Sequence, residues 1–256
     1  MMQDNALTLS NGYWKVLFDP DKGIFSVARS EIPLPRISGA LIQAVYRDHQ
    51  GKKRLADFSG GKTSCSDTLL SDIHGAGKQY KFTSAGRADG LELTYFLNLY
   101  NDRPFILFRL IAINRSRNNI NLYDLNLLHA RAADKGRVDF KNNNRPLDFL
   151  KIGWHDWVYS GLRHGTQHDV DSLPIMKPFT GKMLFDPAVP IGGRRGEFWG
   201  EGWGILTDQQ SAILAGFVST ADQFGTLHAN CKAGASELTL TAPADRSGRR
   251  HLVGAG

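Results

Sequence analysis

The chain has 256 residues, of which 41% are hydrophobic and 10% aromatic, so it can bury a sizeable core and is not a disordered polypeptide. Its length permits one large β-sandwich or two smaller domains. The net charge of +6 comes from small clusters beside turn residues, such as Lys52–Arg54 and Arg194–Arg195. Binding to nucleic acid requires several cations along one face, so this distribution disfavours a nucleic-acid partner.

The two cysteines, Cys65 and Cys231, have no CxxC partner and no histidine at ligand spacing, which excludes a disulfide framework and a zinc knuckle. We expect two buried thiols in a reducing compartment. The most apolar stretch, 105–113, contains Arg109 and is shorter than the roughly 20 residues that cross a bilayer. The N-terminus lacks the basic start and apolar run of a secretory signal. The sequence therefore predicts a cytoplasmic protein with no membrane partner.

Short runs of β-type residues, bounded by turn residues, predict strands along most of the chain. In order, these runs are 13–18, 24–28, 40–46, 80–84, 91–100, 105–114, 121–128, 211–218 and 237–241. The clearest is 91–100, in which odd positions are apolar or aromatic and even positions mostly polar, as in a strand with one buried face. The turn-forming residues 101–104 predict a hairpin with 105–114, and 121–128 would complete a three-stranded meander.

Helical patterns are scarce, because no stretch of twelve or more residues has the apolar spacing of an amphipathic helix. We therefore predict an all-β fold, an antiparallel sandwich with few short helices. The polar segment 130–145 is expected to be a long surface connection. Segment 161–195, with four prolines and five glycines, is a long irregular stretch of the kind that often carries function. We expect one sandwich domain over 1–244 and a frayed tail over 245–256.

Four of the five tryptophans lie in two short segments, 153–161 and 196–204, which flank the irregular stretch. Indole rings stack on the C–H-rich face of pyranose rings, and neighbouring polar side chains bond their hydroxyls. These segments supply the candidate sugar-binding residues Trp154, His155, Asp156, Trp157 and Trp199. The alternative is that the tryptophans fill a sandwich core. Because Trp154 and Trp157 are three positions apart, a strand would place one in the core and expose the other.

A catalytic pair of carboxylates is not recognisable. Glu197 and Glu201 would lie on one face of a strand roughly 13 Å apart, whereas a retaining glycosidase needs about 5 to 5.5 Å. His155, His164 and His168 lie near several aspartates, but the glycines and proline among them argue against a helix that would align ligands. We therefore predict no catalytic residue, no metal site and no cofactor in this chain.

The stretch Gly-Trp-His-Asp-Trp at 153–157 resembles the Trp-Gln-Ser-Trp motif of α-galactosidases in glycoside hydrolase family 36. Gly-Glu-Phe-Trp at 196–199, and Gly-Phe-Val-Ser at 216–219 followed by Gln-Phe at 223–224, are similar to further stretches of that family. Segment 105–114 resembles one of its strands. The order and approximate spacing match, so the resemblance covers residues from about 90 to 230.

The resemblance implies an N-terminal β-supersandwich of the galactose-mutarotase-like kind, which in that family precedes a (β/α)8 barrel bearing two catalytic aspartates. It implies that Trp157 packs on a galactose ring in the active site of the barrel. His155 and Asp156 stand where the family has Gln and Ser, so the hydrogen bonds of those two residues do not carry over. The chain itself contains no barrel.

Three functional hypotheses follow. The first is a non-catalytic domain of an α-galactosidase-like hydrolase, which shapes a galactoside site beside a barrel supplied elsewhere. The second is a stand-alone mutarotase- or epimerase-like enzyme that uses a histidine and a carboxylate for proton transfer; its candidates are His155 or His228 with Glu197 or Glu201. The third is a structural or oligomerisation domain, whose exposed aromatic residues pack on a barrel or another subunit.

Overall fold

The computed structural model describes residues 6–20, 22–32, 34–59, 62–85, 90–153, 159–169, 194–218, 225–234, 236–243 and 252–253. Within these ranges nearly all regular structure is β-strand, and every strand pair is antiparallel. The predicted all-β fold class is confirmed. The one helix in the described ranges is the 3-10 turn η1 (Ala132–Asp134), which is far too short to span a bilayer.

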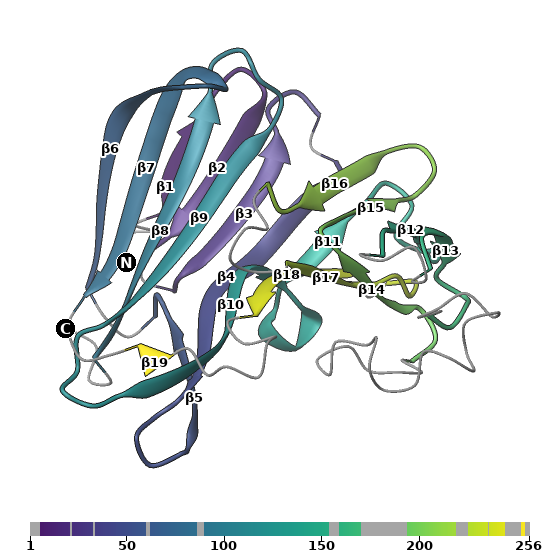
Figure 1. Ribbon diagram of the computed structural model, residues 1–256. Helices are drawn as coiled ribbons and strands as arrows, with labels where there is room; N and C mark the ends of the chain where they lie inside the picture. The colour runs from purple at the N-terminus through teal and green to yellow at the C-terminus, as the bar shows by residue number, and fades with distance from the viewer. Residues whose placement is uncertain are drawn as a thin grey trace, which may run out of the picture.

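The strands form three sheets (Figure 1). The large sheet has the order β1 (Leu7–Ser10), β2 (Trp14–Asp19), β3 (Ile24–Arg29), β4 (Arg36–Arg47), β10 (Ile120–Ala130), β18 (Glu237–Pro243), β17 (Thr226–Asn230) and β14 (Glu197–Glu201). Added to its middle strands are β5 (Lys53–Asp57) and β11 (Arg137–Asp139), which pair with β4, and β19 (Leu252–Val253), which pairs with β10.

Two four-stranded sheets complete the fold. The meander sheet consists of β6 (Lys62–Asp72), β7 (Gly75–Ala85), β8 (Leu91–Tyr100) and β9 (Ile106–Asn114). The small sheet has the order β13 (Gly161–His164), β12 (Asp148–Lys151), β15 (Trp203–Thr207) and β16 (Ala212–Gly216). In Figure 1 the meander sheet lies beside β1–β3, and the small sheet lies near β14, β17 and β18.

Aromatic contacts join both smaller sheets to the large one. Phe18 of β2 meets Phe82 of β7 with ring centroids 4.1 Å apart. Phe149 of β12 and Phe198 of β14 stack nearly parallel, with centroids 6.4 Å apart. All four rings are almost fully buried, so the apolar rows of the period-two strands form a continuous core between the layers.

The predicted hairpin of 91–100 with 105–114 is confirmed, because β8 pairs with β9 from Leu91↔Asn114 to Leu99↔Ile106. The predicted meander is wrong in its third strand, since β10 leaves this sheet and pairs with β4 and β18 of the large sheet. The meander instead extends backwards along the chain to β6 and β7. Alternation identifies a strand with one buried face, but it does not identify the neighbouring strand.

Segment 130–145 is not only a surface connection. It contains η1 and β11, and its residues Val138 and Phe140 are 1% and 2% exposed. Strand β11 pairs with the start of β4, from Arg137↔Ser38 to Asp139↔Arg36. Two apolar side chains are enough to attach this otherwise polar segment to the core.

Both cysteines are free thiols, but the expectation that both are buried is wrong for Cys65, which is exposed on β6. Burial raises the pKa of the Cys231 thiol well above its usual range. Part of the predicted frayed tail, Leu252–Val253, forms the short strand β19; the rest of 245–256 lies outside the described residues.

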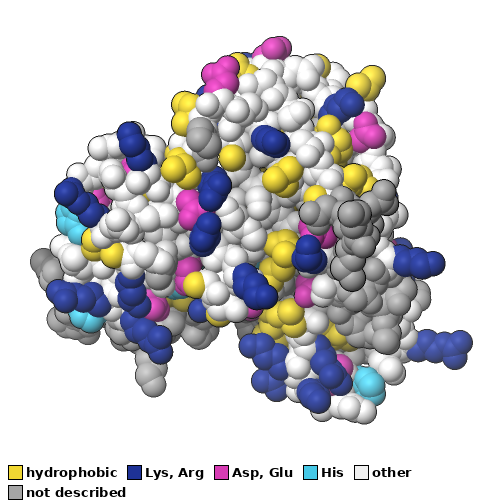
Figure 2. Space-filling view, turned by 180° about the vertical axis from the view of Figure 1, so that it is seen from behind, with side chains coloured by type: hydrophobic (Ala, Val, Ile, Leu, Met, Phe, Trp, Pro, Cys, Tyr) yellow, Lys and Arg dark blue, Asp and Glu magenta, His cyan; other side chains and the backbone are white. Residues whose placement is uncertain are grey.

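The basic side chains are scattered in small groups (Figure 2). One group lies on the β4–β5 hairpin, where Arg47, Lys52, Lys53 and Arg54 are exposed. The Arg54 guanidinium binds the Asp48 carboxylate at 2.8 Å, so part of this charge is neutralised locally.

Candidate functional site

The large sheet has a polar face opposite its core. In β14 the half-buried Glu197, Trp199 and Glu201 alternate with the buried Phe198 and Gly200. The neighbouring strands continue this alternation. Three cross-strand rows define this polar face: Glu197, Asn230 and Glu237; Trp199, His228, Thr239 and His129; and Glu201, Thr226, Thr241, Asn126 and Gln43.

Much of the polar face is shielded from solvent, and its side chains bond one another. Glu237 is 7% exposed and accepts hydrogen bonds from the backbone N–H of Ala132 at 2.7 Å and the side-chain amide of Asn230 at 3.2 Å. The Thr241 hydroxyl donates to Asn126 at 2.8 Å. Buried polar groups are costly unless bonded, so these bonds fix the geometry of the face.

Trp199 lies against His228 in the middle row. Their ring centroids are 4.4 Å apart, and the planes are inclined by 43°. Burial lowers the pKa of His228 to about 4, although the nearby Glu197 carboxylate opposes that shift. At neutral pH the imidazole is therefore uncharged and packs against the indole as a neutral ring in a tilted arrangement.

Glu197 sits at the end of the same strand as Trp199. Its carboxylate accepts from the Lys232 ammonium at 2.9 Å. Partial burial raises the pKa of Glu197, but the Lys232 ammonium, together with the nearby His228 and Arg194, outweighs burial, so the net pKa lies below the usual value. The prediction that Glu197 and Glu201 share one face of a strand is confirmed by the alternating burial of β14.

A buried ion pair fixes the backbone of this strand. The Lys151 ammonium at the end of β12 lies 2.8 Å from the Asp169 carboxylate, and the two side chains are 3% and 1% exposed. The other oxygen of Asp169 accepts from the backbone N–H of Trp199 at 2.8 Å. Asp169 thereby connects β12, the end of segment 159–169 and β14.

Of the five sequence-predicted binding residues, the structure places Trp199 on the polar face. Trp154, His155, Asp156 and Trp157 lie outside the described residues, so their roles stay predictions.

The described ends of that tryptophan segment lie beside β14. The backbone N–H of Gly153 donates to the Ser160 hydroxyl at 2.9 Å. The N–H of Glu201 donates to the Ile152 carbonyl at 2.8 Å. The two tryptophan segments are thus anchored next to each other in space.

Of the histidines and aspartates weighed as metal ligands, the structure describes His164, His168 and Asp169. The His164 imidazole contacts the Asp148 carboxylate at 2.6 Å, while Asp169 binds Lys151. Within the described ranges, no three side chains of His, Cys, Asp or Glu converge as a metal site would require.

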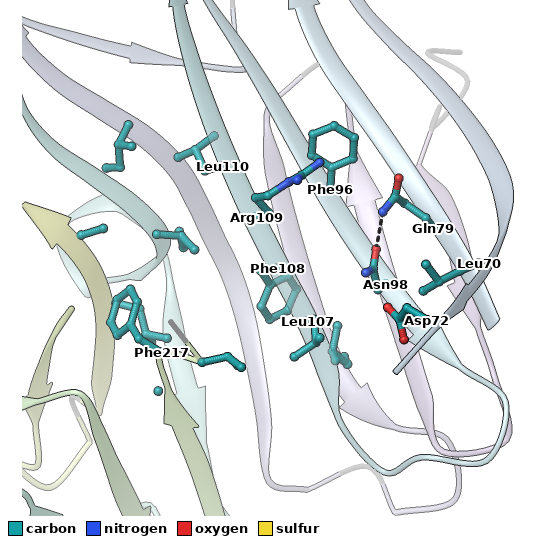
Figure 3. A pocket seen from close by; sticks show the side chains of 17 residues that line it. Leu70, Asp72, Gln79, Phe96, Asn98, Leu107, Phe108, Arg109, Leu110 and Phe217 are labelled. Carbon is teal, nitrogen blue, oxygen red and sulfur yellow. Dashed lines mark hydrogen bonds between the residues drawn. The ribbon is translucent and has the colours of Figure 1, made fainter. Parts of the chain in front are cut away.

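A groove of about 530 Å³ lies between one face of the meander sheet, with lining residues from all four of its strands, and the end of β16 in the small sheet (Figure 3). Phe108 of β9 and Phe217, which follows β16, line it together with apolar residues of β10 and β18. At its outer margin the amide of Gln79 donates to Asn98 at 3.0 Å, and the Arg109 guanidinium covers the Phe96 ring at 4.3 Å. The groove is apolar inside and polar at its rim.

Sequence reasoning missed the polar face as a unit, although a signal for it was present. Thr226, His228 and Asn230 alternate with apolar residues, and Glu237, Thr239 and Thr241 do the same in the next strand. This period of two shows that both strands have a polar side. Only their pairing in the sheet shows that the polar sides meet.

No protein-family model and no curated protein matches this sequence. Among solved structures, the fold is similar to that of the α-N-acetylgalactosaminidase NagBb from Bifidobacterium bifidum in its complex with GalNAc, with a TM-score of 0.54 and 12% identity. The match covers 93% of this chain and 33% of that one. The chain thus corresponds to about a third of the length of a glycosidase, and the likeness shows a shared fold.

Proposed function

We propose that this chain is a non-catalytic, carbohydrate-associated domain of an α-galactosidase-like hydrolase, in which an aromatic platform helps to shape the sugar site. The observation that carries the proposal is the position of Trp199 on β14, beside the hydrogen-bonded described ends of the Trp154–Trp157 segment. The fold shared with a glycosidase supports it.

The chemistry of the polar face suits a binding role. His228 covers one side of the Trp199 ring, while Glu197 and Lys232 add a hydrogen-bonding pair at its margin. A pyranose offers an apolar face for an indole and hydroxyls for charged and amide groups. We infer that Trp157 supplies the stacking surface and that Trp199 supports the segment carrying it.

The same groups are poorly arranged for acid/base catalysis at neutral pH. Proton transfer at an anomeric carbon needs one protonated and one deprotonated group. The pKa values of His228 and Glu197 are both lowered, so neither holds a proton to donate. We propose that bond cleavage is catalysed by a barrel supplied by further chain or by a partner.

The test is binding of galactose and GalNAc by titration calorimetry to the wild type and to Trp157→Ala, Trp199→Ala and Trp203→Ala. Trp203 is the matched control, because it is 43% exposed on β15 of the small sheet. An aromatic contact is worth about 0.5 to 1.5 kcal/mol, so the first two variants should bind up to about tenfold more weakly. The Trp203 variant should bind as the wild type does.

Failure of the wild type to bind either sugar, or equal binding by all variants, would contradict the binding role. Cleavage of a galactoside by the purified chain would contradict the assignment of catalysis elsewhere.

A second candidate, the mutarotase-like enzyme, keeps one supporting observation: His228 and Glu197 are close enough for each to shift the pKa of the other. Polarimetry with freshly dissolved α-galactose tests it. Because neither His228 nor Glu197 carries a proton to donate at pH 7, we expect the chain not to accelerate mutarotation at that pH. An acceleration that His228→Gln abolishes would establish the enzyme in place of the binding domain.

A further inference from the structure

Among the described strands, β6 is an outer strand of the meander sheet, and no described strand pairs with its outer edge. It has 11 residues and pairs with β7 without a bulge, from Lys62↔Ala85 to Asp72↔Gly75. The other terminal strands among the described sheets have 4, 5 or 9 residues. Proteins usually protect such edges with proline, bulges, charged side chains or short length. Strand β6 has no proline and no bulge, and its charged residues are Lys62, Asp67 and Asp72.

In an antiparallel sheet, odd- and even-numbered residues of a strand direct their backbone N–H and C=O groups to opposite sides, so the groups that face the outer edge of β6 can be identified. The N–H of Asn101 donates to the carbonyl of Ala76 at 2.9 Å, so even-numbered residues of β7 bond toward β8. In antiparallel pairs hydrogen-bonded positions alternate, so odd-numbered residues of β7 bond toward β6. Through the register of β6 with β7, the residues whose N–H and C=O groups point to the outer edge are Thr63, Cys65, Asp67, Leu69 and Ser71.

The side chains at this edge are also exposed. Leu69 is 89% exposed, and Cys65 is exposed two positions earlier. A leucine so open on such an edge is typical of a contact surface. The Asp67 carboxylate lies 3.5 Å from the Lys78 ammonium of β7, which offsets its negative charge.

We infer that β6 pairs antiparallel with β6 of a second copy of this chain, joining the two meander sheets into one eight-stranded sheet. If the two-fold axis passes through Asp67, the middle residue of β6, all 11 residues of the strand pair with the other copy. This axis places Lys62 opposite Asp72 at both ends, so opposite charges meet twice. It also places Leu69 opposite Cys65, which covers both exposed side chains.

The second copy is favoured as the occupant because the strand is complementary to itself. The charges at its two ends are opposite. At the centre the axis places Asp67 opposite Asp67 of the other copy, a like-charge pair that opposes pairing, and the Lys78 ammonium beside each Asp67 offsets this repulsion. The five outward residues offer about ten backbone hydrogen bonds across the axis. This surface lies on the meander sheet, whereas the polar face lies on the large sheet, so pairing would leave the proposed sugar site open.

Sedimentation velocity on the full chain over a dilution series tests the pairing. The wild type should be a dimer that dissociates on dilution. Leu69→Pro removes an outward N–H without breaking the bonds of β6 to β7, and it should weaken the dimer at least tenfold. Leu69→Ala, the matched control, keeps that N–H and should weaken it less. A wild type that is monomeric throughout, or Leu69→Pro as dimeric as the wild type, would overturn the inference.

Engineered cysteines test the register. With Asp67 on the axis, Ser66 faces Thr68 of the other copy at a non-hydrogen-bonded position, about 4.5 Å between Cα atoms, which a disulfide can span. Ser66 of one copy and Ser66 of the other lie diagonally, about 7 to 8 Å apart, which is too far for a disulfide.

Chains with Cys65→Ser and Ser66→Cys, mixed with chains bearing Cys65→Ser and Thr68→Cys, should form a disulfide-linked dimer on mild oxidation. Neither species should do so alone. Cross-linking within either single species, or none in the mixture, would refute this register.

Discussion

The buried His228 makes the stability of this protein depend on pH in a way that can be calculated. The perturbation is a fall in pH from 7.5 to 4, applied to the wild type and to His228→Gln. In the folded chain the pKa of His228 is lowered from 6.5 to about 4, mainly by burial. In the unfolded chain the imidazole has its ordinary pKa near 6.5.

The sign follows from these two values. Between about pH 6.5 and pH 4 the unfolded chain binds a proton at His228 that the folded chain does not, so stability falls as the pH falls through this window. Above pH 7 neither state is protonated there, and the effect vanishes. Each pKa unit corresponds to about 1.4 kcal/mol, so the loss attributable to this residue reaches about 3 kcal/mol at pH 4.

The assay is urea unfolding, followed by tryptophan fluorescence at a series of pH values. The glutamine variant lacks the titrating ring, so its stability should fall less steeply than that of the wild type between pH 6.5 and 4. His49→Gln serves as the control, because His49 is exposed in the turn between β4 and β5. Parallel pH profiles for the wild type and His228→Gln would refute the argument that this imidazole is buried and neutral.

Two further changes test the packing around the site, both measured as the free energy of unfolding. Lys151→Met leaves the buried Asp169 carboxylate without its ammonium partner and should cost about 3 to 5 kcal/mol; adding Asp169→Asn should recover much of the loss, and no recovery would contradict a charge effect. Phe198→Ala empties a fully buried position between two sheets and should cost about 3 to 5 kcal/mol, whereas a loss below about 1 kcal/mol would show that this contact is not part of the core.

The sequence was most informative where structure is local. The run 91–100 alternates at most positions, and a turn-forming tetrapeptide follows it, so the hairpin of β8 with β9 could be predicted almost to the residue. Strand β6 could not be predicted in this way. Nearly all of its side chains are exposed on both faces, so it has no apolar alternation, and only its pairing with β7 makes it a strand.

The candidate site shows the same division. The tryptophan segments were identified from composition, and the alternation in β14 correctly placed Glu197 and Glu201 on one face. The contact of Trp199 with His228 depends on the pairing of β14 with β17, which joins segments far apart in the chain. The Lys151–Asp169 pair likewise has no local signature, because burial of both charges depends on the sheets that surround them.

The sequence by itself determined that the chain is built of antiparallel strands, because period-two alternation and turn residues act over a few neighbouring positions. Only the tertiary structure decided which strands share a sheet, which face is polar, and which described strands lie at the ends of the sheets. These properties depend on contacts between distant segments, and a local pattern is compatible with many such pairings.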